Sequence, residues 1–299
     1  MTFKILKLIS KGFVMTATSA SPAGRGGRLA ARFTAVATAA LAAAAAAATI
    51  GAAPASASVR NWVMTGWGVH LTNQMDPATT SHFFNTNTSY GTGPNSTGNP
   101  ISDGYSTNAV LTYTSYAQFA SDLQNKAISP NYKWVLYDPE MWSQTPVNEQ
   151  QNPALYLKLF GQLGHANGYS VVEVPARDLA QVPGSACPQL PGENLDHWFV
   201  RCNMAGAAAA YSDVFVLQDQ VNTVNLTEFD YLYNTARGQA LAANPQVQVD
   251  AEVSTNYGTP DQMATAARSV GADGYYISAT TPTIAQADLF LQEMQAAGY

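Results

Sequence analysis

Two acidic side chains stand two residues apart at the end of a short apolar segment. The segment is Trp134-Val-Leu-Tyr137, and Asp138 and Glu140 follow it. Residues i and i+2 of an extended strand share a face, so we expect both carboxyl groups to point the same way. Two carboxyl groups that close oppose each other's ionisation, which raises one pKa and keeps a proton bound near neutral pH. A protonated carboxyl group beside a charged one is what general acid cleavage of a glycosidic bond requires.

The same two residues also have a purely structural interpretation. Asp-Pro is a common turn and helix-entry sequence, in which Asp138 would cap a helix and Pro139 would be its first residue. Glu140 would then form a salt bridge with an arginine of a neighbouring loop, such as Arg177. The sequence leaves the catalytic and the structural interpretation open.

Further polar and aromatic side chains follow the other apolar segments of the chain. Glu173 and Glu252 end two of these segments, and we treat them as reserve carboxylates for the same reaction. The apolar face of a sugar stacks on flat rings, and Trp142 is the first choice for such a platform. The other expected substrate-binding residues are Trp67, Gln218, Asp219, Gln220 and Tyr276.

Apolar segments of strand length alternate with stretches of helical spacing. Such alternation predicts right-handed βαβ units and a parallel sheet. Seven units are visible and an eighth is obscured, while residues 71–108 are interpreted as a long irregular segment. Strands are expected at 62–67, 109–112, 134–137, 169–174, 213–217, 247–253 and 274–277, and helices at 116–125, 153–168, 226–243, 260–270 and 284–297.

The fold class expected from these units is α/β, a single (β/α)8-type, TIM-like barrel. No Gly-rich phosphate loop follows the first expected strand, which favours a closed barrel over an open nucleotide-binding sheet. The active sites of such barrels lie at the C-terminal ends of the strands. The polar residues that follow the strands are therefore expected to gather at one mouth.

The segment Val135-Leu-Tyr-Asp-Pro-Glu140 resembles the end of the catalytic strand of chitinase-type (family 18) glycoside hydrolases, where an Asp-x-Glu pair ends an apolar strand. The resemblance implies that Glu140 is the acid and that Asp138 orients the N-acetyl group of the substrate, which attacks in place of an enzyme nucleophile. It also implies positioning roles for Tyr276, Gln218 and Gln220. The chain departs from the family at 133–136, where Lys-Trp-Val-Leu replaces further acidic residues.

Other barrel glycosidases use two glutamates from different strands, and the sequence permits this equally. Glu140 or Glu173 would then be the acid and Glu252 the nucleophile. The segment Tyr137-Asp-Pro-Glu-Met-Trp142, with Thr145-Pro and residues 149–153, is also similar to secreted actinobacterial proteins. That similarity implies a compartment and no particular reaction.

The first 57 residues have the features of a secretory signal peptide. Arg25, Arg28 and Arg32 precede an apolar run at 33–51, and Ala55-Ser-Ala57 is a small-x-small cleavage site. We therefore expect residues 1–57 to be removed, leaving one extracellular domain at 58–299 with no membrane association. Translation from Met1 or from Met15 is compatible with this interpretation.

The charge of the expected mature chain excludes some partners. The whole chain has 14 basic and 20 acidic residues; six of the basic ones lie in the signal region, which leaves 8 against 20 and a net charge of −12. So acidic a chain is a poor partner for nucleic acid or an anionic membrane surface. Sparse charge with many amide and hydroxyl side chains suits a carbohydrate partner, and we expect a monomer.

Cys187 and Cys202 are expected to form a disulfide outside the cytoplasm.

Two other function classes remain open from the sequence. A barrel with a carbohydrate-binding groove but no turnover would be a binding or inhibitory protein. A phosphodiesterase-type hydrolase would require His70 or His82 to reach the mouth. No Gly-x-Ser-x-Gly motif is present, which argues against a conventional serine hydrolase, and no metal-ligand spacing or cofactor motif is found, so neither a metal nor a cofactor is expected.

Overall fold

Eight parallel strands form a closed barrel in the computed structural model, which describes residues 60–93 and 103–299. The strands lie in chain order, and the last pairs with the first, so the sheet has no free edge. This confirms the expected TIM-like fold. The strands are β1 Asn61–Thr65, β2 Ser89–Gly93, β3 Asn108–Tyr113, β4 Trp134–Tyr137, β5 Ser170–Glu173, β6 Val214–Leu217, β7 Gln248–Ser254 and β8 Gly274–Ser278.

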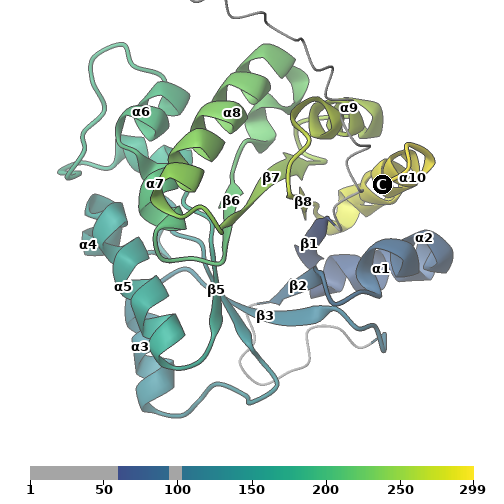
Figure 1. Cartoon of the computed structure of the whole chain (residues 1–299), viewed down its shortest axis with the longest axis horizontal. Helices are drawn as coiled ribbons and strands as arrows, with labels where there is room; N and C mark the ends of the chain where they lie inside the picture. The colour runs from purple at the N-terminus through teal and green to yellow at the C-terminus, as the bar shows by residue number, and fades with distance from the viewer. Residues whose placement is uncertain (1–59, 94–102) are drawn as a thin grey trace, which may run out of the picture. The chain divides into compact units, whose positions relative to one another are not determined.

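Helices follow the strands and surround the barrel (Figure 1). The longest, α8 Leu226–Ala243, has the bounds predicted from its periodicity, and α9 Pro260–Val270 begins with a capping box between Thr259 and Gln262. The other helices are α1 Gly66–Met75, α2 Pro77–Phe84, α3 Tyr116–Gln124, α4 Val147–Gln151, α5 Pro153–Ala166, α6 Leu195–Arg201, α7 Met204–Ala209 and α10 Ile284–Ala296, with short 3-10 turns η1 Arg177–Gln181, η2 Gln220–Val224 and η3 Thr281–Thr283.

The interpretation of residues 71–108 as a long irregular segment was wrong for its described first part. The end of α1, all of α2 and all of β2 lie within it. Asp76 starts α2 by accepting hydrogen bonds from the backbone N–H groups of Ala78 and Thr79, both at 3.1 Å, and Pro77 is its first residue. The obscured eighth strand is β2, whose sequence Ser-Tyr-Gly-Thr-Gly has no apolar run.

The core has two parts, one inside the barrel and one between the strands and the helices. Alternate strand residues face the interior, so this division decides which side chains reach the mouth. On β5, for example, Val172 faces inward while Val171 packs against the helices. The interior residues are Val63, Tyr90, Val110, Leu136, Val172, Val174, Val214 and Val216.

The expected disulfide between Cys187 and Cys202 is present and joins the loop before α6 to the end of that helix. The expected signal peptide lies outside the described residues, so its removal and the boundary at residue 57 stay predictions. In residues 60–93 and 103–299, no helix is long and apolar enough to span a bilayer.

One buried carboxylate links α4 to the elements that hold the end of β4. Glu149 is fully buried and accepts hydrogen bonds from the backbone N–H groups of Tyr116 and Ala117, at 2.7 and 3.0 Å. The hydroxyl groups of Ser115 and Tyr137 also donate to it, at 3.1 and 2.8 Å. Glu149 therefore satisfies the free N-terminal N–H groups of α3 and ties that helix to β4.

Candidate active site

Asp138 and Glu140 come together at the mouth of the barrel, as the sequence predicted. The backbone of Asp138 continues the β4 ladder through a 2.9 Å hydrogen bond to the carbonyl oxygen of Tyr113. The amide nitrogen Nε2 of Gln218, just after β6, donates to Asp138 Oδ1 at 2.9 Å and to Glu140 Oε1 at 3.4 Å. Because one nitrogen atom makes both contacts, the two carboxyl groups lie close together at the mouth.

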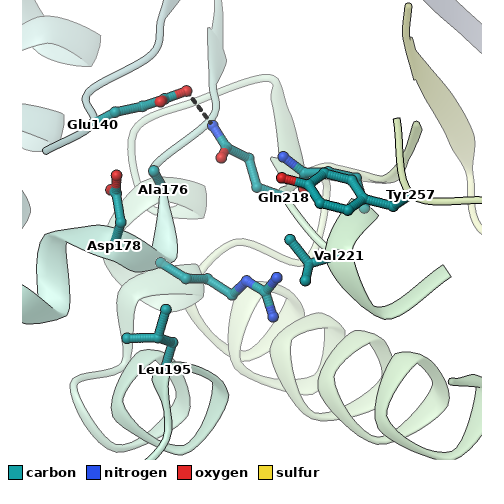
Figure 2. Close-up of a pocket in the computed structure, with 9 residues that line it drawn as sticks. Glu140, Ala176, Asp178, Leu195, Gln218, Val221 and Tyr257 are labelled. Carbon is teal, nitrogen blue, oxygen red and sulfur yellow. Dashed lines mark hydrogen bonds between the residues drawn. The ribbon is translucent and has the colours of Figure 1, made fainter. Parts of the chain in front are cut away.

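A cavity of about 200 Å³ opens beside this pair. Figure 2 shows Glu140, Asp178 and Gln218 around it, with the Glu140 carboxylate directed to the Gln218 amide. Asp178, in η1, is held in place because its Oδ1 accepts the backbone N–H of Met141 at 3.0 Å. The lining residues are Glu140, Ala176, Arg177, Asp178, Leu195, Gln218, Gln220, Val221 and Tyr257.

The electrostatics of the mouth favour protonated carboxyl groups. Burial raises the pKa of Glu140, and the nearby Asp178 carboxylate raises it further. The pKa of Asp138 is raised by burial first and then by repulsion from Glu140 and Asp178. The hydrogen bond from Gln218 acts in the opposite direction on both groups. The mouth thus holds a proton-retaining carboxyl group in contact with solvent, which is what a general acid needs.

Glu252, on β7, belongs to the same group of carboxyl groups. It is only 5% exposed, and burial raises its pKa, with further repulsion from Asp138 and Glu140. Tyr276, on β8, lies beside it, and its hydroxyl group is 3.4 Å from Thr92 Oγ1 on β2. The structure therefore brings three of the four expected catalytic carboxyl groups, with Tyr276, to one mouth.

Glu173 is the fourth expected catalytic carboxyl group, and the structure does not bring it to the mouth. Its neighbours Val172 and Val174 face the barrel interior, so the Glu173 side chain lies on the opposite face of β5, toward the helices. It is fully buried there, and neither of its carboxylate oxygen atoms has a hydrogen-bond partner among the described residues. The expected role of Glu173 as an acid was wrong for this reason.

Of the polar residues after β6, two line the cavity and one does not. Gln218 and Gln220 are lining residues, and Gln220 Oε1 is buried without a donor among the described residues. Asp219 is fully buried away from the cavity, where it accepts a 2.8 Å hydrogen bond from Asn222 Nδ2. Its expected contact with a substrate was wrong because its side chain is directed into the protein.

Arg177 lines the cavity, but its charge is paired with groups other than Glu140. Its guanidinium group contacts Asp196 and lies 4.0 Å from Asp219 Oδ1. The salt bridge between Arg177 and Glu140 in the structural interpretation is therefore not formed. Within the described part of the chain, Asp138, Glu140, Asp178 and Glu252 form no ion pair.

The expected tryptophan platforms lie elsewhere, and a tyrosine takes their place at the cavity. The indole N–H of Trp142 donates to Thr145 Oγ1 at 2.8 Å, and the ring does not line the cavity. Trp67 lies in α1 rather than on a strand, 59% exposed and with its ring 5.3 Å from that of His70. Tyr257, which follows β7, lines the cavity and is 49% exposed.

Neither histidine of the phosphodiesterase interpretation lines the cavity beside Glu140. His70 pairs with Asp103, with 3.0 Å between Nδ1 and Oδ1. His82 lies in α2, and its Nε2 is 2.8 Å from the carbonyl oxygen of Tyr299. The structure therefore does not supply the His/Asp site that this alternative requires.

Asp178 is the residue at this site that the sequence reasoning missed. The strand-end rule pointed to Glu173, but the chain continues through Val174-Pro-Ala-Arg-Asp178 before the carboxylate reaches the mouth. A polar residue several positions beyond a strand gives only a weak sequence signal. The apolar residues around Glu173 were the available hint, because they leave no alternation from which to read its face.

Comparison with known proteins bears on the fold alone. No protein-family profile and no curated protein matches the chain. Among solved structures, the N-terminal domain of a protein assigned as an aldolase from Bacteroides vulgatus is 11% identical, with 80% of this chain and 81% of that chain covered and a TM-score of 0.47. A sugar phosphate isomerase/epimerase from Parabacteroides distasonis is 10% identical, with 79% and 96% covered and a TM-score of 0.44. Ttha1563 from Thermus thermophilus is 12% identical, with 46% and 38% covered and a TM-score of 0.27. The strand order of this chain, rather than these similarities, establishes the barrel.

Proposed function

We propose that the chain is an exported glycoside hydrolase with Glu140 as its general acid. The observation that carries the proposal is the position of Glu140: it lines an open cavity, and burial and the nearby Asp178 carboxylate raise its pKa. A neutral carboxyl group at a solvent-filled cavity can give its proton to a leaving oxygen. Export is the part of the proposal that rests on the expected signal peptide.

The roles of the residues follow from which of them line the cavity. Glu140 donates the proton, because it is the member of the Asp138–Glu140 pair that lines the cavity. Asp138 is the partner carboxyl group, and the Gln218 amide fixes its position beside Glu140. Glu252 is the second carboxylate within the same mouth and the reserve for attack on the sugar or activation of water.

The carboxyl groups of the mouth favour turnover over simple binding. In a binding protein we would expect the carboxylates to be tied into salt bridges, with amides and aromatic rings contacting the sugar. Here the four described mouth carboxylates have no cationic partner, which is costly to maintain for stability alone. Unpaired, proton-retaining carboxyl groups are typical of catalytic sites.

The test is hydrolysis of a panel of glycans by the protein secreted into the medium of a host that expresses the full chain. N-terminal sequencing of that protein should give a start near Ser58. New reducing ends should appear on at least one member of a panel of chitin, chitosan, peptidoglycan, β-glucans, xylan and α-glucans. Failure to release reducing ends from any of them, by protein of correct fold, would rule out the proposed activity for these substrate classes.

The pH dependence of turnover should identify the acid. A general acid must be protonated, so kcat/KM should fall as pH rises through the raised pKa of Glu140. Asp178→Asn removes a negative charge that raises this pKa, so the alkaline limb of the profile should move to lower pH. The Asn side chain keeps an oxygen for the Met141 N–H. An unchanged alkaline limb in this variant would show that Glu140 is not the titrating acid.

A further inference from the structure

The cavity beside Glu140 contains a second carboxyl group, Asp178, without a cationic partner among the described residues. Glu140 and Asp178 both line it, and neither forms an ion pair within the described part of the chain. Arg177 is the one cationic side chain among the described lining residues, and Asp196 and Asp219 already contact it. A bound ligand therefore meets the Asp178 carboxylate, whose charge no cationic side chain of the described lining residues balances.

The hydrogen-bonding groups of the cavity favour a ligand that carries hydrogen-bond donors. Gln220 Oε1 is buried and has no donor among the described residues. Asp178 Oδ1 accepts the Met141 N–H at 3.0 Å, which fixes the carboxylate at the cavity. The Nε2 donor of Gln218 is engaged by Asp138, Glu140 and the carbonyl oxygen of Val174. Gln220 Oε1 is thus an acceptor without a donor among the described residues, and an unpaired buried acceptor is costly until a donor reaches it.

The volume of the cavity limits the size of the ligand. Its volume of about 200 Å³ is below the range for drug-sized ligands, which is roughly 300–1,000 Å³, and suits one sugar unit. Val221 and Tyr257, 46% and 49% exposed, form an apolar rim on which the next unit of a chain can lie. The cavity therefore accommodates one unit of a glycan.

We propose that this cavity takes a cationic sugar, a hexosamine unit whose amino group is free and protonated, and that Asp178 is the carboxylate that binds its ammonium group. An ammonium group has a positive charge and three donors, so it fits a carboxylate without a cationic partner. The inference rests on the proposed function, because it names the substrate class of the same site. It also favours cleavage by protein carboxylates, since a free amine cannot attack as an N-acetyl group does.

Binding of unhydrolysed monosaccharides tests the inference directly. The methyl glycosides of glucosamine and glucose differ in one group, an ammonium in place of a hydroxyl, and methyl N-acetylglucosaminide adds the acetyl group. We expect ligand-detected NMR titration of the secreted protein at about pH 6 to give at least tenfold tighter binding of the amine than of either neutral sugar. Equal affinities, or preference for the acetylated sugar, would overturn the inference.

Two variants separate a built site from general attraction to an acidic protein. Asp178→Asn should remove most of the preference for the amine, and a circular dichroism spectrum equal to that of the unaltered protein shows that the variant is folded. Glu293→Gln removes one charge on α10 from a residue that does not line the cavity, and it should keep the full preference. An equal loss in both variants would mean non-specific ionic attraction and would contradict the inference.

The outcomes for the inference and for the proposed function are distinguishable. Glu140-dependent hydrolysis of neutral or acetylated glycans, without preference for the amine, would retain the hydrolase and reject the cationic substrate. Preference for the amine that depends on Asp178, without hydrolysis of chitosan or of any other glycan, would retain the ligand class and reject the hydrolase.

Discussion

Glu140→Gln should lower the rate of glycan hydrolysis by roughly 10²- to 10⁴-fold, the usual contribution of a general acid. Gln has nearly the same shape as Glu and can still contact the Gln218 amide through its oxygen, but it has no proton to give to a leaving oxygen. KM should change much less than kcat, because the side chain acts on the reaction rather than on binding of the ground state. Reducing-end release under saturating and limiting substrate measures both quantities.

The controls for this experiment use residues already described. Glu293→Gln should retain the activity of the unaltered protein, since Glu293 does not line the cavity. A substrate with a good leaving group, such as an activated aryl glycoside, should restore much of the lost rate in Glu140→Gln because its departure needs no proton. A Glu140→Gln protein with full activity on unactivated glycans would move the acid to another carboxyl group of the mouth, with Glu252 first.

Glu149→Ala should destabilise the protein by about 3–5 kcal/mol, the largest effect we expect from one substitution outside the mouth. The change leaves four buried donors without their acceptor: two hydroxyl groups and two N-terminal N–H groups of α3. It also removes a favourable negative charge from the start of that helix. Urea denaturation followed by circular dichroism gives the difference in free energy of unfolding.

A graded variant checks the cause of that loss. Tyr137→Phe removes only one of the four donors to Glu149 and keeps the ring that stacks on Phe160, so we expect a loss of about 1 kcal/mol. A loss in Glu149→Ala no larger than that in Tyr137→Phe would show that the backbone N–H groups of α3 find water in place of the carboxylate.

The barrel could be predicted from the sequence wherever strands carried apolar runs. The runs that became β4 and β6 are continuous and buried, and helix α8 was found to the residue because its apolar spacing ends at Asn244. β2 was missed because its polar and glycine residues are buried by neighbouring strands, which no local pattern records. β2 therefore forms through its pairing with β1 and β3 and not through a local sequence pattern.

The site was predictable in part for a related reason. Alternation along a strand placed Asp138 with Glu140 and pointed Glu252 to the mouth, because the parity of those positions could be read from the residues. The sequence carries no information on the face of Glu173, which depends on the tilt of the barrel and on which valines fill its interior. Trp142 was expected to stack on a sugar, but its ring does not line the cavity, and its indole N–H donates to Thr145 Oγ1 across a loop.

The burial of Glu173 between β5 and the helices couples folding to proton uptake. Burial raises the pKa of this carboxyl group well above its ordinary value, so the folded chain keeps a proton that the unfolded chain releases. At pH values below the ordinary pKa of a glutamate, the folded and the unfolded chain both hold this proton, so the group does not lower the free energy of unfolding. As the pH rises from there to the raised pKa, the unfolded chain releases the proton and the free energy of unfolding falls. Acid usually unfolds proteins, yet through this residue mild acidity strengthens the barrel.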